Sequence, residues 1–169
     1  MTTDTAQRTD EGTGTSSRRW LLAAGFVVVV VVYAGLSRVW TDTESAWYRG
    51  LDEPPYQPPD AAFGIVWPLN YLALLVVGVL VSLQHPARAP RLLAVLAGSV
   101  VPALGWAYLF SQEHLLVPPA VSLAVAALIT WLLLALAWRV RWWYGALLLV
   151  YACWMTLASA LSIGFAVLN

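Results

Sequence analysis

Residues 47–71 read WYRGLDEPPYQPPDAAFGIVWPLNY, a loop dense in prolines and aromatics that runs straight into an apolar segment. Proline holds φ near −65°, so the two Pro-Pro pairs stiffen the loop. The aromatic side chains add large flat faces. We therefore predict a lid over a ligand pocket inside a membrane bundle. The residues of this predicted lid are Trp47, Arg49, Pro54, Tyr56, Pro58 and Pro59.

The rest of the chain is very apolar. Of its 169 residues, 60% are hydrophobic and only 11% are charged, against roughly 25% charged residues in soluble domains. Five apolar runs are long enough to span a bilayer, which takes about 20 residues. They cover about 20–39, 62–83, 92–110, 118–138 and 142–166.

Segments in lipid must satisfy their own backbone hydrogen bonds, so these runs are predicted helices. The predicted fold is an all-α membrane protein, a bundle of five transmembrane helices with the lid between the first two. Residues 18–169 form one domain in this interpretation. Residues 1–17 are polar and predict a disordered tail, because they offer too little apolar surface to bury.

Arginine placement predicts the topology of an integral membrane protein. With the N-terminus inside, Arg38 and Arg49 fall outside. The arginines of the inner segments are Arg8, Arg18, Arg19, Arg88, Arg91, Arg139 and Arg141. This positive-inside bias puts the 40–61 loop and the C-terminus outside. We expect a prokaryotic cytoplasmic membrane.

Several function classes find no support in the sequence. The net charge is zero, so no basic face indicates a nucleic-acid partner. The single cysteine, Cys153, excludes an internal disulfide and a cysteine-cluster metal site. His85 and His114 fall on opposite sides of the membrane in this topology, so they cannot act together. We predict no metal site and no required cofactor.

A layer of aromatics is predicted in the outer half of the membrane. At a rise of about 1.5 Å per residue, Tyr33, Trp67, Trp106 and Trp154 fall at similar depth. Pockets for small molecules are mostly apolar with few polar anchors, so a flat ligand suits this layer. Tryptophans also form ordinary belts at membrane interfaces, and composition leaves that alternative open for Trp67 and Trp106.

Helical spacing groups large and small side chains on shared faces, as a slot for a flat ligand requires. Residues three or four apart share a helix face. The groups are Trp67 with Tyr71, Ala103 with Trp106 and Phe110, and Tyr151 with Trp154 and Ala158.

The lid and the segment after it resemble the TspO/MBR family of tryptophan-rich sensory or translocator proteins, also called peripheral-type benzodiazepine receptors. The motif runs from Trp47-Tyr48 through Leu51, Pro54, Tyr56, Pro58-Pro59, Phe63-Gly64 and Val66-Trp67 to Tyr71. A second match is Tyr151-x-x-Trp154-x-x-x-Ala158 with a terminal Asn169, and a weaker one is Trp106-x-x-x-Phe110. The resemblance covers about residues 20–169.

The resemblance implies a five-helix bundle that is often a homodimer. Family members bind tetrapyrroles such as protoporphyrin IX and haem, and some bind sterols or benzodiazepine-type drugs. Suggested roles include tetrapyrrole transport, stress sensing and light-dependent porphyrin breakdown. The expected ligand-binding residues are Tyr48, Phe63, Trp67, Tyr71, Ala103, Trp106, Tyr151, Trp154 and Ala158. Trp67 and Trp154 would be catalytic only if porphyrin photodegradation occurs.

Some positions depart from the family pattern. They are Glu53 for a basic residue, Tyr56 for tryptophan, Ala103 and Ser162 for asparagine, Ala107 for serine and Val150 for proline. Fewer polar anchors favour a ligand with a less polar face, since an unpaired buried polar group costs about 1–3 kcal/mol. We expect Glu53 to repel a propionate, and Arg49 to be the alternative carboxylate partner.

Three functions remain open at this point. The first is a membrane receptor or sensor that binds tetrapyrroles or similar flat lipophiles. The second is a light-dependent porphyrin-degrading enzyme, and the third is a facilitated transporter of porphyrin- or sterol-type lipophiles. Ala94 and Gly98 form a small-xxx-small patch that suits either a homodimer or packing within the bundle.

Overall fold

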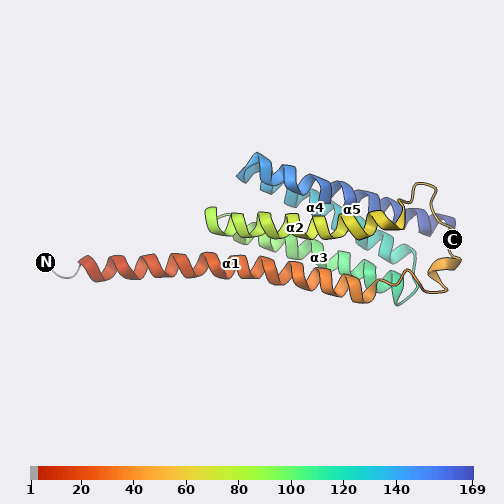
Figure 1. The fold of residues 1–169 in the computed structure, drawn as a ribbon, viewed down its shortest axis with the longest axis horizontal. Helices are drawn as coiled ribbons and strands as arrows, with labels where there is room; N and C mark the ends of the chain where they lie inside the picture. Colours follow the sequence, from red (N-terminus) through yellow and green to blue (C-terminus); the bar gives the residue numbers. More distant parts are fainter. Residues whose placement is uncertain (1–3) are drawn as a thin grey trace.

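The computed structural model describes residues 4–169, with side chains from Ser16 onward. Within that range the chain forms helices α1 (Asp4–Trp40), α2 (Asp60–Gln84), α3 (Ala89–Ser111), α4 (Val117–Val140) and α5 (Trp142–Leu168), with a 3-10 turn, η1 (Tyr48–Gly50). All five α-helices contain a stretch long and apolar enough to cross a membrane. The predicted five-helix membrane bundle is therefore confirmed (Figure 1).

Helix α1 begins earlier than the apolar pattern indicates. Its membrane-spanning part covers Ser16–Trp40, and the helix extends back to Asp4, beyond the end of the bundle (Figure 1). The predicted disordered tail, residues 1–17, overlaps this extension. Residues 1–3 and the side chains of residues 4–15 lie outside the described part of the chain, so the tail stays a prediction.

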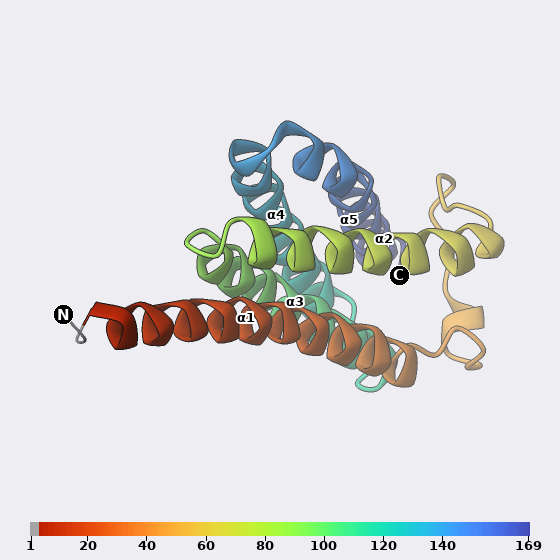
Figure 2. The ribbon, with the colours of Figure 1, turned by 60° about the vertical axis from the view of Figure 1, so that its left-hand side comes forward.

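The helices form a ring whose order differs from their order in the sequence. Around the ring, α1 packs on α2, α2 on α5, α5 on α4, α4 on α3, and α3 on α1. A short connection usually makes two consecutive helices antiparallel neighbours, but α2 and α3 share only a small contact. In Figure 2, α1 runs alongside both α2 and α3, so each of these helices packs on α1 rather than mainly on the other.

Close backbone approach fixes the α1–α2 pair. A Cβ atom at Gly78 would lie 2.4 Å from Cδ1 of Phe26, so only glycine leaves room for that ring. Phe26, Val30 and Tyr33 then lie buried along the inner face of α1. Outward faces are covered with exposed aliphatic side chains such as Val28, which suits a hydrocarbon solvent.

The lid and the C-terminus lie at one end of the ring, and the short α2–α3 and α4–α5 connections lie at the other (Figure 1). Proline helps to set the helix starts at both ends, since its fixed φ suits the first turn and it has no N–H to leave unpaired. Pro59 precedes α2, and α3 and α4 carry proline in their first two positions.

Candidate functional site

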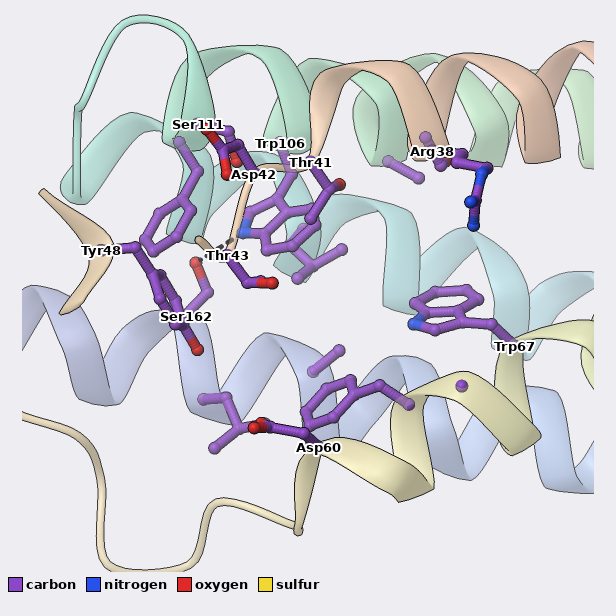
Figure 3. A pocket seen from close by; sticks show the side chains of 18 of the residues that line it. Arg38, Thr41, Asp42, Thr43, Tyr48, Asp60, Trp67, Trp106, Ser111 and Ser162 are labelled. Atoms are coloured by element: carbon purple, nitrogen blue, oxygen red, sulfur yellow. Dashed lines mark hydrogen bonds between the residues drawn. The ribbon is translucent and has the colours of Figure 1, made fainter. Parts of the chain in front are cut away.

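A cavity of about 550 Å³ lies inside the ring beneath the lid (Figure 3). Helices α1, α2, α3 and α5 and the lid contribute most of its wall. Helix α4 contributes one residue, Leu123. The aromatic residues that line it are Tyr33, Tyr48, Phe63, Trp67, Tyr71, Trp106, Phe110 and Phe165. Such a volume and such a wall suit a small, mostly apolar ligand, because ligand pockets measure about 300–1,000 Å³.

The wall from α2 is an aromatic ladder. Phe63, Trp67 and Tyr71 follow at four-residue steps and all line the cavity, as residues on one helix face do. The rings of Trp67 and Tyr71 stack with centroids 5.7 Å apart and an angle of 24° between planes. Tyr33 of α1 meets both rings edge-on, at 6.3 and 5.3 Å. These contacts hold the indole of Trp67 in place at the cavity wall.

Helix α2 also carries a proline within this wall. Pro68 lacks a backbone N–H, so the carbonyl of Gly64, four residues earlier, loses its usual helical donor. Both residues line the cavity. The wall therefore contains a backbone acceptor in an otherwise apolar stretch.

The wall from α3 pairs a small residue with a second aromatic stack. Trp106 and Phe110 stack with centroids 5.6 Å apart and an angle of 15° between planes. The indole Nε1 of Trp106 donates a hydrogen bond of 3.1 Å to Oγ of Ser162 on α5. Ala103, one turn earlier, is buried and leaves space beside the indole.

Two of the expected ligand-binding residues lie outside the cavity lining. Trp154 touches the far side of the α2 ladder, edge-on to Trp67 at 6.4 Å and to Phe63 at 5.3 Å. It belongs to an outward-facing groove with Val66 and Leu157. Tyr151 is fully buried in the bundle core and does not line the cavity.

The other expected members of that set line one cavity. They are Tyr48, Phe63, Trp67, Tyr71, Ala103, Trp106 and Ala158. Of the aromatic residues expected at one depth, Tyr33 and Trp154 each meet the ring of Trp67 edge-on. Trp106 stands in the α3 wall and has Phe110 as its aromatic partner.

The lid is fastened to α5 by hydrogen bonds at two points. Tyr56 donates from its hydroxyl to the carbonyl of Ala160 at 2.9 Å. The side chain of Asn169 accepts from the backbone N–H of Asp52 at 2.8 Å and donates to its carbonyl at 3.1 Å. Between these points Pro54 is buried against Gly164, where a Cβ atom would lie 2.7 Å from the proline ring. Only glycine at position 164 therefore leaves room for the lid to pack closely on α5.

The beginning of the lid packs against the C-terminal end of α3 and the loop that follows it. Trp47 meets Phe110 edge-on at 5.1 Å and stacks on His114 at 4.6 Å. Tyr48 contacts Phe110 at 6.2 Å and Phe165 at 5.8 Å. Aromatic contacts of this kind contribute about 0.5–1.5 kcal/mol each, so the lid is held on both sides of the opening.

Tyr48 brings a neutral phenol into the cavity. Partial burial is the main cause that raises its pKa, and the nearby charges of Glu53 and Asp60 raise it further. The hydrogen bond from Gln57, 3.4 Å long, acts in the opposite direction. The phenol therefore stays protonated at neutral pH and is available as a hydrogen-bond donor.

The charged residues of the cavity are not the two that the sequence indicated. Arg49 donates to the carbonyl of Glu44 and does not line the cavity, and neither does Glu53. Both belong to the lid, and both side chains are exposed. Arg38, Asp42, Glu44 and Asp60 line the cavity instead.

Sequence reasoning marked Tyr33 in α1 but missed the other residues that the end of this helix and the chain just after it contribute. Tyr33, Ser37 and Thr41 line the cavity at four-residue steps, and Ala34 and Arg38 follow the same spacing beside them. This periodicity was available as a signal, because residues four apart share a helix face. Ser111 of α3 and Phe165 of α5 are further lining residues that no motif marked.

Comparison with known proteins agrees with this arrangement. The family model described as TspO/MBR family matches residues 25–168. The chain is also similar to Protein CrtK of Rhodobacter capsulatus, with 27% identity over 119 residues that cover 69% of this chain and 74% of that protein. The match spans all five helices, the lid and every residue of the cavity wall. This integral membrane protein belongs to the TspO/MBR family.

Proposed function

We propose that this protein is a membrane receptor or sensor that binds a tetrapyrrole, such as protoporphyrin IX or haem, or a similar flat lipophile. One observation carries the proposal. Stacked aromatic pairs from two helices, Trp67 with Tyr71 and Trp106 with Phe110, line a single cavity under a fastened lid. Flat aromatic walls favour a flat aromatic ligand, because offset stacking adds to the free energy of apolar burial.

Two features of the cavity support a tetrapyrrole over a sterol. The first is the number of aromatic rings in the wall. A tetrapyrrole can stack on these rings, whereas a saturated sterol skeleton can make only apolar contacts with them. The second is the presence of charged and phenolic groups at the mouth, including Arg38 and Tyr48. A tetrapyrrole has carboxylates to place at such a mouth, whereas a sterol has one hydroxyl.

The orientation and the membrane are also proposals. Arg88, Arg139 and Arg141 lie at the end of the ring opposite the lid. Because arginines concentrate on the inner side of a membrane, we place the lid and the C-terminus outside a prokaryotic cytoplasmic membrane. A ligand would then enter from the outer side.

A homodimer through α3 is supported by the surface of that helix. Ala94 and Gly98 are exposed, and a Cβ atom at Gly98 would meet no atom within 4 Å. The small-xxx-small patch is therefore not used for packing within the bundle. A second copy is the occupant we propose, since small residues let two helices approach closely in lipid.

Titration with protoporphyrin IX in detergent tests the receptor proposal. We expect saturable quenching of tryptophan emission and a saturable shift of the porphyrin absorbance band. The variant with Trp67→Phe and Trp106→Phe changes two cavity residues and should bind more weakly. The matched control carries Trp131→Phe and Trp142→Phe, two exposed residues outside the cavity. Absence of saturable binding, or equal weakening by both double variants, would contradict the proposal.

A second candidate function is the light-dependent breakdown of porphyrin. The contact that favours it is the edge-on approach of Trp154 to Trp67 at 6.4 Å. Trp67 lines the cavity and would face an excited porphyrin, and Trp154 stands directly behind it. Illumination of the complex in air tests this candidate. If the Trp67→Phe variant still bleaches the porphyrin absorbance band as the wild type does, the Trp67 indole has no role in the breakdown.

A further inference from the structure

Arg38 brings a positive charge into the aromatic cavity. It lies in the last turn of α1. Figure 3 shows its side chain pointing from α1 toward the indole of Trp67. The lining of the cavity otherwise carries only negative formal charges, on Asp42, Glu44 and Asp60. A guanidinium beside an aromatic wall is a suitable partner for a carboxylate on a flat ligand.

The neighbouring residues satisfy their hydrogen bonds without the Arg38 guanidinium. No hydrogen bond joins it to the other side chains drawn in Figure 3, which include Asp42 and Asp60. A carboxylate oxygen of Asp42 instead accepts from the backbone N–H of Glu44 at 2.9 Å. The end of α1 is capped by Gln112, whose Nε2 donates to the carbonyl of Trp40 at 2.9 Å. Arg38 is therefore not needed to satisfy the helix end or the lid turn.

The negative charges lie in other parts of the mouth. Figure 3 shows Asp60 at the start of α2, across the cavity from Arg38, and Asp42 in the chain that leaves α1. A ligand carboxylate beside Arg38 gains a pair of charge-assisted hydrogen bonds. A second carboxylate placed toward Asp42 or Asp60 meets like charge, which disfavours its ionised form.

We propose that Arg38 forms a subsite for a single carboxylate, so that the cavity selects flat lipophiles with one ionised acid group over those with two or none. This inference rests on the proposed receptor function and adds the charge of its ligand. Arg38 is a specificity-determining residue here, and Arg49, which belongs to the lid, has no such role.

A set of protoporphyrins that differ only in esterification tests the subsite. The probes are the free diacid, the monomethyl ester and the dimethyl ester, each titrated in neutral detergent by the shift of porphyrin absorbance. The proteins are the wild type, Arg38→Gln, and the control Arg49→Gln, which removes an outer-side arginine that does not line the cavity. The dimethyl ester also reports whether each variant still folds with an intact cavity.

In the wild type we expect the monomethyl ester to bind about tenfold more tightly than the dimethyl ester, as for a charge-assisted pair worth 1.4 kcal/mol. The diacid should bind more weakly than the monoester, because its second carboxylate meets like charge, and a diacid that binds as tightly as the monoester would overturn the selection. Arg38→Gln should bring the monoester to the affinity of the diester, and Arg49→Gln should keep the tenfold difference. Equal binding of monoester and diester in the wild type, or a difference that survives Arg38→Gln, would overturn the subsite alone. Failure of all three probes to bind would overturn the receptor proposal together with it.

Discussion

The indole Nε1 of Trp106 on α3 donates a 3.1 Å hydrogen bond to the hydroxyl of Ser162 on α5, across one end of the cavity. Ser162 is buried, with 2% of its surface exposed. The bond fixes the plane of the indole and so the shape of the α3 wall. It also provides the acceptor that a buried indole N–H requires.

Replacing Ser162 by alanine should therefore leave this N–H without a partner. We expect Ser162→Ala to lower stability by about 1–3 kcal/mol, the cost of an unpaired buried polar group. Thermal unfolding in detergent measures the effect. In a Trp106→Phe background the same change should cost much less, because the donor is already gone. Equal costs in the two backgrounds would show that the hydrogen bond is not the cause.

Gly164 allows the lid to pack closely on α5, and the Gly164→Ala substitution should displace the lid. The added Cβ atom would lie 2.6 Å from the hydroxyl of Tyr56 and 2.7 Å from the ring of Pro54. Overpacking of this kind costs about 1–3 kcal/mol. We expect faster hydrogen exchange of the backbone amides of Asp52, Glu53, Tyr56 and Gln57, the non-proline residues of this part of the lid. Gly35→Ala is the matched control, since its Cβ meets no atom within 4 Å. An unchanged exchange rate in Gly164→Ala would mean that the lid is not held at this position.

Trp67 and Trp154 should differ in their effect on binding, although both match the family motif. Trp67 lines the cavity, whereas Trp154 lies behind it in the outward groove. We expect Trp67→Phe to weaken protoporphyrin IX binding about threefold to tenfold, the loss of a part of one aromatic contact. Trp154→Phe should change the affinity less than twofold. The absorbance shift of the porphyrin measures both, and a larger loss in Trp154→Phe would contradict this placement.

His85, at the end of the ring opposite the lid, should make stability depend on pH. Its partial burial is the main cause that lowers its pKa, and the charges of Arg141 and Arg88 add to this. The unfolded chain, with an ordinary pKa near 6.5, then binds the proton more readily than the folded chain. The contribution to stability is therefore present above about pH 6.5 and is lost as the pH falls through the lower folded value.

Melting temperatures in detergent, measured between about pH 7.5 and pH 5.5, check this prediction around the ordinary histidine pKa. We expect the wild type to lose more stability over that range than His85→Gln. His114→Gln, a change at the lid end of the bundle, is the control for histidine replacement. An identical loss in the wild type and His85→Gln would assign the pH dependence to other groups.

The sequence alone determined the elements of this protein. Long apolar runs can only be helices in lipid, because no water is there to satisfy the backbone. The Pro-Pro pairs and aromatics of residues 47–71 marked the lid. Spacings of three and four residues grouped Ala103 with Trp106 and Trp67 with Tyr71, and both pairs line the cavity, since helix geometry decides which residues share a face.

Only the tertiary structure decided which way each face points. Lipid is as apolar as the bundle interior, so the hydrophobic pattern of a membrane helix does not separate its inner face from its outer one. Rotation of α5 therefore placed Trp154 in an outward groove, although the spacing put it with Ala158. In the same way, packing of α1 between α2 and α3 put Arg38 in the cavity, whereas Arg49, in the motif itself, turned to a backbone carbonyl of the lid.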